Sequence, residues 1–139
     1  MADATRAIER PLSPHLSVYR IMINTVMSIV HRITGAALYF GTLLLAAWLV
    51  AAAMGERQFT LVNSLFGHPL GQLVLFGYTW AIFHHMLGGL RHFIWDTGSN
   101  LDITSVDVLS WATIILSLLL TAALWFYIAT TRGWLAAWQ

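Results

Sequence analysis

Cysteine and lysine are both absent from the 139 residues of this chain. Without cysteine, the chain can form no disulfide, no thiolate-ligated iron–sulfur cluster and no Cys-x-x-Cys-His attachment for covalent haem. Any haem would have to be held by histidine and by non-covalent contacts. Positive charge comes only from arginine, and the net charge is +1. This balance gives no broad basic surface, which excludes nucleic acid as an expected partner.

Charged residues of either sign are scarce as well. They make up 9% of the chain, against about 25% in an average soluble domain. Hydrophobic residues account for 58%, and the mean hydropathy is +0.71. We therefore predict a membrane protein that contacts lipid. The chain before Ile21 contains Asp3 and Glu9 and no apolar core, so it predicts neither a secretory signal peptide nor a mitochondrial transit peptide.

Three segments have the length of a membrane-spanning helix, which needs about 20 mainly apolar residues. Their apolar cores cover 33–54, 70–90 and 109–129, and we expect the helices at 28–54, 69–94 and 107–131. The first helix could also begin earlier, near Asn24 or Thr25, with an interfacial first turn. Loops are expected to begin at Gly55 and Asp96, and Ser105 or Asp107 is expected to cap the third helix. The predicted fold class is an all-α membrane protein. It is one transmembrane domain over 1–139, in which 1–27 precede the helices.

The arginines beside these spans set the expected orientation. Arg57 and Arg132 lie on one side of the membrane. Five others lie on the opposite side: Arg6, Arg10, Arg20, Arg32 and Arg91. Because arginine is enriched in cytoplasmic segments, we predict a multi-pass protein of the bacterial inner membrane whose N-terminus and second loop are cytoplasmic. The mitochondrial inner membrane, where that side would face the matrix, is less favoured.

His85 is an ionisable side chain within the second span. Such a residue is costly at membrane depth and suggests a functional site. A neutral imidazole has a lone pair, so a metal ligand and a proton carrier are the two functional interpretations. A structural hydrogen bond to a neighbouring helix explains it equally well from the pattern alone. His84 is a rival of equal depth, turned by about 100° around the helix.

Further polar residues are predicted to form a layer just above His85. Ser28, His31 and Arg32 share one face of the first helix at i, i+3 and i+4. His92 follows His85 by about two turns and lies about 10 Å nearer the cytoplasmic surface. Since the first span leaves that surface where the second returns to it, these groups should share one depth with Arg91.

This layer suits a b-type haem. The iron needs an axial imidazole in the apolar region, and the propionates need arginine or histidine donors at the interface. Gly88 and Gly89 leave room for a flat macrocycle or for a close helix, and helix packing is the commoner use of glycine. Taken singly, Arg32 and Arg91 are typical topology anchors. Because His85 is the one well-placed axial ligand, a second would have to come from a partner subunit.

Three motifs, in order along the chain, resemble one family. They are Arg10-Pro-Leu-Ser-Pro-His-Leu-Ser-Val-Tyr-Arg20, Ser28-Ile-Val-His-Arg-Ile-Thr-Gly35 and His85-x-x-x-Gly89-x-Arg91-His92-x-x-Trp95-Asp96. Together with the three spans, they make the chain similar to the cytochrome b subunit of succinate dehydrogenase, the larger membrane anchor of respiratory complex II. The resemblance covers essentially the whole chain.

The resemblance implies a complex with a flavoprotein subunit, an iron–sulfur subunit and a smaller membrane anchor. This chain would form half of the heterodimeric anchor bundle, which holds heme b and ubiquinone. It would be a non-catalytic subunit, inactive alone. His85 would be the axial ligand, with the other axial ligand on the smaller anchor. His31, Arg32 and His92 would lie near the propionates, and Ser28 and Arg32 would bind ubiquinone. The alternatives are a quinol:fumarate reductase anchor and a haem-free structural anchor.

Overall fold

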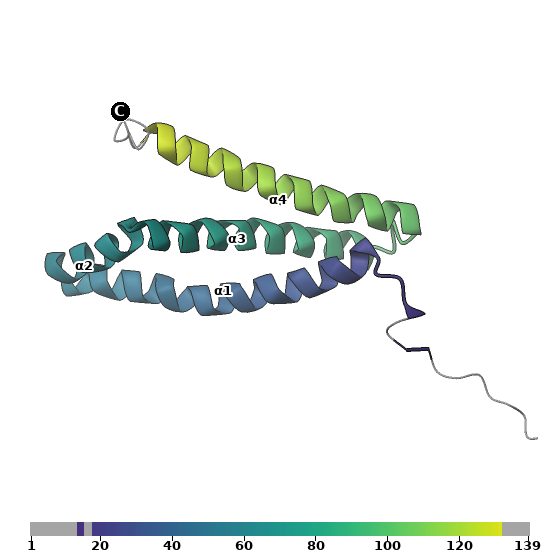
Figure 1. The fold of residues 1–139 in the computed structure, drawn as a ribbon, viewed down its shortest axis with the longest axis horizontal. Coiled ribbons are helices and arrows are strands. Elements are labelled where there is room, and N and C mark those ends of the chain that lie inside the picture. Colours follow the sequence, from purple (N-terminus) through teal and green to yellow (C-terminus); the bar gives the residue numbers. More distant parts are fainter. Residues whose placement is uncertain (1–13, 16–17, 132–139) are drawn as a thin grey trace, which may run out of the picture.

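The computed structural model describes residues 14–15 and 18–131, which contain four helices and no strand. They are α1 (Ile23–Met54), α2 (Glu56–Gly67), α3 (Pro69–Asp96) and α4 (Ile103–Thr131). The three long helices lie side by side, and α2 closes the turn between α1 and α3 (Figure 1). Three of the arginines used to predict the orientation, Arg6, Arg10 and Arg132, fall outside the described residues.

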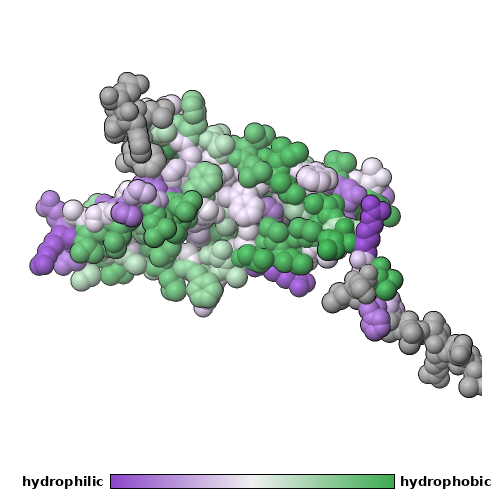
Figure 2. Space-filling model, viewed as in Figure 1, coloured by the Kyte–Doolittle hydropathy of each residue, from purple (hydrophilic) through white to green (hydrophobic). Residues whose placement is uncertain are grey.

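Three transmembrane helices were predicted, and α1, α3 and α4 are long and apolar enough to cross a membrane. The shortest, α3, has 28 residues, which span roughly 42 Å at the α-helical rise. A bilayer core is only about 30 Å thick, so each helix extends beyond it. Figure 2 shows the corresponding pattern, with hydrophobic residues concentrated over the middle of the bundle and hydrophilic ones towards both ends. The all-α membrane fold is therefore confirmed.

The ends of α4 and α1 differ from the sequence-based expectation. We expected Ser105 or Asp107 to cap α4, but the helix already begins at Ile103. The carboxylate of Asp102 accepts a hydrogen bond of 3.0 Å from the Ser105 N–H, which is the usual N-cap arrangement. This bond holds the pKa of Asp102 below its usual range. α1 begins at Ile23, ahead of residue 28 and next to the earlier start expected near Asn24 or Thr25.

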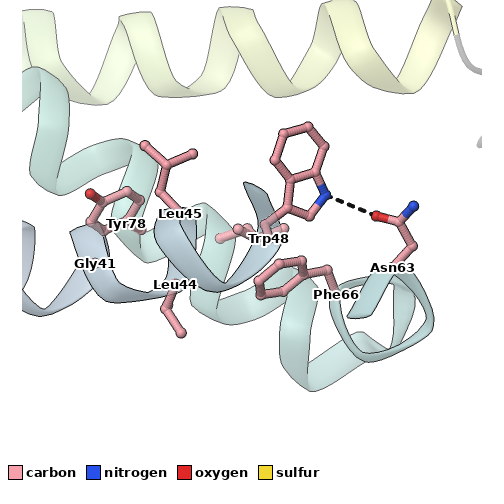
Figure 3. A pocket seen from close by; sticks show the side chains of 8 residues that line it. Gly41, Leu44, Leu45, Trp48, Asn63, Phe66 and Tyr78 are labelled. Carbon is pink, nitrogen blue, oxygen red and sulfur yellow. Dashed lines mark hydrogen bonds between the residues drawn. The ribbon is translucent and has the colours of Figure 1, made fainter. Parts of the chain in front are cut away.

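A further helix, α2, replaces what was expected to be a plain loop. Gly55 separates it from α1 with a φ of +118°, a value that favours glycine. Gly71 allows α2 to lie close against α3, because a Cβ there would overlap the main chain of Leu65. Trp48 of α1 donates a hydrogen bond of 3.1 Å to Asn63 of α2 (Figure 3). These contacts fold the connection back onto the bundle.

The interior of the bundle is lined by small polar residues. One face of α4 is buried, and its side chains are Ser110, Thr113, Ser117 and Thr121. Each hydroxyl donates to a carbonyl of its own helix. Buried large hydrophobic residues are few, and most leucines point outward. This arrangement is expected in lipid, where small residues bring helices together and apolar side chains gain nothing by leaving the surface.

Candidate functional site

A cavity of about 320 Å³ opens between the start of α1 and the end of α3. Its lining comprises Asn24, Ser28, His31, Arg32, Arg91, His92 and Trp95. The structure therefore brings together the layer of arginine and histidine that the common-depth argument predicted. His85 lies directly beside this layer, because its ring stacks on that of His31. The roles of these residues as ligands remain predictions.

The two histidine rings of the stack come from different helices. The rings of His31 (α1) and His85 (α3) are parallel to within 3°, and their centroids are 4.0 Å apart. On the other side of His31, the ring of His92 lies 5.4 Å away and is tilted. Three imidazoles thus form one continuous group, from the membrane interior to the cavity.

Hydrogen bonding orients the His85 ring. Its Nδ1 atom lies 3.2 Å from the main-chain oxygen of His31 and 3.4 Å from Oγ1 of Thr34. A carbonyl oxygen can only accept, so Nδ1 carries the hydrogen in this bond and Nε2 keeps its lone pair. Metal-bound histidines are typically held in this way, with the non-ligating N–H donated to a carbonyl. The Nε2 lone pair of His85 is therefore not used in the bond to His31.

His84, the rival in the sequence, has a different environment. Only 1% of its side chain is exposed, and it lies on the buried face of α3 with Ala81, Gly88 and Arg91. Both of its ring nitrogens are buried without a hydrogen-bond partner among the described residues, and its ring contacts that of Trp80. A ligand shared with another subunit must reach the surface of the chain. His85, which is only partly buried, meets that requirement and His84 does not.

Arg91 joins three helices at the base of the cavity. It is 4% exposed, and its Nη1 donates a hydrogen bond of 3.0 Å to Ser110 of α4. The one hydroxyl hydrogen of Ser110 is shared between the Val106 carbonyl of α4 and the side-chain oxygen of Asn24 of α1, which lies 2.8 Å away. Asn24 donates to Asp107 at 3.3 Å. The guanidinium also lies over the Trp95 ring, 4.9 Å from its centroid. Arg91 thus links α3 to α4 directly and to α1 through Ser110, and it also lines the cavity.

The sequence reasoning did not identify Asn24, Ser110 or Asp107 as partners in this network. Asn24 and Asp107 lie near the starts of α1 and α4, at the same end of the bundle as Arg91 near the end of α3, so the depth argument contained a signal for them. Ser110 lies among apolar residues of the third span and gave no signal, because a serine in a helix can bond its own main chain.

Arg32 and Ser28 line the cavity from α1 and are both exposed. Within the described part of the chain, neither side chain makes a hydrogen bond, and no ion pair holds Arg32. Their polar atoms are therefore available to a molecule that enters the cavity or to a neighbouring subunit.

The geometry around His85 fits a b-type haem. Gly89 is one turn further along α3, and a Cβ built on it would meet nothing within 4 Å. No side chain of the described residues therefore covers this position on the His85 side of α3. Among the described residues, no group of three or more His, Asp or Glu side chains could hold a metal ion. The haem interpretation thus depends on His85 as the single ligand from this chain.

Several known proteins are similar to this chain over most of its length. The cytochrome b556 subunit of succinate dehydrogenase from Paracoccus denitrificans is 45% identical over 103 residues, covering 74% of this chain and 78% of that protein. The Rickettsia felis protein of the same name is 36% identical over 117 residues, covering 84% and 91%. The mitochondrial cytochrome b560 subunit of Sus scrofa is 38% identical over 118 residues, covering 83% and 69%.

A family model for the succinate dehydrogenase/fumarate reductase transmembrane subunit matches residues 6–124. This range includes α1, α2, α3 and most of α4, and therefore every residue of the cavity and of the histidine stack. The chain belongs to the succinate dehydrogenase/fumarate reductase transmembrane subunit family.

Proposed function

We propose that this chain is the cytochrome b membrane anchor of a succinate dehydrogenase, and that it helps bind heme b and ubiquinone so that electrons from succinate reduce ubiquinone to ubiquinol. The observation that carries the proposal is the orientation of His85. Its Nδ1–H is directed at the His31 carbonyl, which leaves Nε2 as a ligand atom on a face that another subunit can reach.

In this proposal, His85 would hold the haem iron from this chain, and the smaller anchor would supply the other ligand. When bound, the haem provides one-electron redox chemistry. Three side chains that line one cavity would donate to the anionic propionates: His31, Arg32 and His92. Nδ1 of His31 is buried without a partner, so Nε2 is the atom with which His31 donates. Charge-assisted hydrogen bonds of this kind are stronger than those between neutral groups.

For ubiquinone, Ser28 and Arg32 act from the mouth of the cavity. The Ser28 hydroxyl donates a hydrogen bond to a quinone carbonyl. Arg32 stabilises the negative charge that develops on a quinone oxygen during reduction, as donors do in an oxyanion hole. An arginine with a pKa above about 12 is a poor proton source. The two protons that ubiquinol gains therefore come from water or from a partner side chain.

The partners in this proposal are the flavoprotein, the iron–sulfur subunit and the smaller membrane anchor. Exposed Ser28 and Arg32, with a ligand histidine at the surface, form only part of a site. We place the complex in the bacterial inner membrane, with the N-terminus of this chain on the cytoplasmic side. This orientation follows from the arginine distribution. It also places the cavity on the side where soluble catalytic subunits would dock.

A quinol:fumarate reductase anchor is the second candidate, because the matching family model covers both kinds of enzyme. The curated relatives are named as succinate dehydrogenase subunits, which favours the first. The two functions differ in the direction of electron transfer between succinate and quinone. The reduction potentials of the other subunits set that direction. A haem-free anchor is less favoured, because it would not need the free Nε2 lone pair of His85.

The test is the reduced-minus-oxidised absorbance spectrum of the purified complex, for His85→Ala and His84→Ala side by side. We expect the b-type band to disappear or shift in His85→Ala and to keep its position in His84→Ala. A normal band in His85→Ala would remove the ligand assignment. No band in the unaltered complex would favour the haem-free anchor.

A further inference from the structure

Two glycines face the stacked imidazoles across the α1–α3 interface. A Cβ on Gly35 of α1 would lie 2.9 Å from Cε1 of His85 on α3. In the reciprocal contact, a Cβ on Gly88 of α3 would overlap the ring of His31 on α1, with Nδ1 nearest and Cε1 at 2.9 Å. Real Cβ atoms essentially never come within 3.0 Å of such neighbours. An alanine at either position must therefore displace the facing ring.

Neither ring can move away freely. His85 is held by its Nδ1 bond to the His31 carbonyl and by contact with Thr34, and its ring lies against that of His31. The Nδ1 edge of His31 is buried and faces Gly88. Cε1 of His85 is bonded to both ring nitrogens, so a push on Cε1 moves Nε2 with it.

We propose that Gly35 and Gly88 are positioning residues for the His85 ligand nitrogen. By having no side chain, each glycine allows the imidazole of the opposite helix to occupy the α1–α3 interface. Together the two glycines allow the His31 and His85 rings to stack, and this stacking sets the direction of the His85 Nε2 atom. The inference rests on the proposed function, since it assigns these glycines to a haem ligand. Losing an outer-shell support of a metal ligand typically lowers metal affinity by about 10-fold or more.

The chain offers a matched control for both substitutions. Gly77 also lies in α3, and a Cβ on it would meet nothing within 4 Å. Gly77→Ala therefore adds the same methyl group, and the same gain in helix propensity, without touching a histidine. Gly89 also has open space beside it, but it lies on the His85 side of α3 and is left unchanged.

The experiment measures haem bound per assembled complex, haem affinity by titration, and the electron paramagnetic resonance signal of the oxidised haem. We expect Gly35→Ala and Gly88→Ala each to lower haem affinity about 10-fold and to shift the signal, because Nε2 moves. Gly77→Ala should match the unaltered complex. If all three alanine variants behave like the unaltered complex, the proposal is overturned.

A double-mutant cycle separates contact with the ring from general helix packing. His31→Ala removes the ring that a Cβ on Gly88 would overlap, so Gly88→Ala should cost little thermal stability in that background. Gly35→Ala faces His85 instead, which the main-chain oxygen of residue 31 and Thr34 still hold, so it should keep more of its effect than Gly88→Ala. The thermal midpoint of the complex is the readout, since it does not require that haem binding survive His31→Ala. An undiminished Gly88→Ala effect in the His31→Ala background would overturn the assignment.

Two outcomes need separate treatment. If Gly88→Ala prevents assembly of the complex, assembly is measured again in the double variant Gly88→Ala/His31→Ala. Recovery of the four-subunit complex supports the proposal, and continued failure contradicts it. If His85→Ala keeps a normal haem band, the proposed function has failed. If His85→Ala loses the band while Gly35→Ala and Gly88→Ala do not alter haem binding, only the role of the glycines has failed.

Discussion

The two ends of the bundle each contain a cavity between α1 and α3, and the two cavities differ in chemistry far more than in size. The cavity near the start of α1 measures about 320 Å³ and has two arginines and two histidines in its lining. The cavity near α2 measures about 390 Å³, and its lining includes Leu44, Leu45, Phe66 and Leu75. Its polar groups are the hydrogen-bonded Trp48–Asn63 pair and the hydroxyl of Tyr78 (Figure 3).

The larger cavity is therefore the poorer candidate for redox chemistry. A membrane protein has many apolar crevices, because lipid or neighbouring helices fill them at little cost. Buried or membrane-depth arginine and histidine are expensive and persist where they have a use. We call the two regions the arginine end, around Arg32 and Arg91, and the α2 end, around Trp48 and Asn63. The predictions below compare variants at these two ends.

The largest expected effect is on stability, from Arg91→Ala. This change removes a buried charged hydrogen bond to Ser110 and the contact with Trp95. We expect a loss of roughly 2–4 kcal/mol, seen as a lower thermal midpoint of the purified complex. Arg57→Ala, an exposed arginine on α2, is the matched control and should change little. Equal midpoints for the two variants would mean that Arg91 does not tie the helices together.

The next effect is on activity, from Arg32→Ala. Succinate–ubiquinone activity should fall about 10²-fold, the usual cost of removing a donor that stabilises developing charge. Succinate oxidation with an artificial acceptor at the soluble subunits should largely remain. Asn63→Ala at the α2 end should preserve both activities. A parallel fall of both activities in Arg32→Ala would indicate an assembly defect and would weaken the quinone assignment.

A smaller effect on the same activity is expected from Ser28→Ala. One hydrogen bond to the quinone is worth about 1 kcal/mol, so the activity should fall about fivefold. Ser64→Ala is the matched control, because that hydroxyl is on α2 and donates only to the Leu61 carbonyl. The measurement is the initial rate at several ubiquinone concentrations. If the two serine variants have the same rate, Ser28 has no role in quinone binding.

The smallest effect is expected from Asn63→Ala at the α2 end. It removes the acceptor for the Trp48 N–H, which should cost about 1 kcal/mol of local stability. Amide hydrogen exchange across α2 should quicken, while the haem spectrum and the quinone activity stay constant. A loss of quinone activity here would erase the proposed difference between the two ends.

The sequence predicted the three spans and the shared depth of the polar residues, because hydropathy and the alternating direction of successive helices determine both. Residue spacing alone could not separate His84 from His85, and the choice of His85 came from the resemblance. The two differ by about 100° around one helix, and only the packing of α1 and α4 shows which side is covered. In the structure, α1 supplies the carbonyl of His31 that orients His85, a main-chain contact that leaves no trace in the residue pattern.

The departures from the sequence-based expectation have similar causes. α2 is a short helix whose stability comes from contacts such as Trp48–Asn63, and a 12-residue segment has little helical preference alone. Asp102 caps α4, whereas the later Asp107 accepts from Asn24 instead. Several polar residues near a helix start compete for the cap, and the packing of neighbouring helices decides which one is used.

Photoaffinity labelling with an azido-ubiquinone tests the central claim most directly, because it asks which end of the bundle holds the quinone. The labelled complex is digested, and the modified peptides of this chain are identified by mass spectrometry. We predict label on peptides from the arginine end, covering residues 24–32 or 91–95, and competition by unmodified ubiquinone. Label confined to residues 44–66 at the α2 end, with none near Arg32, would contradict the account.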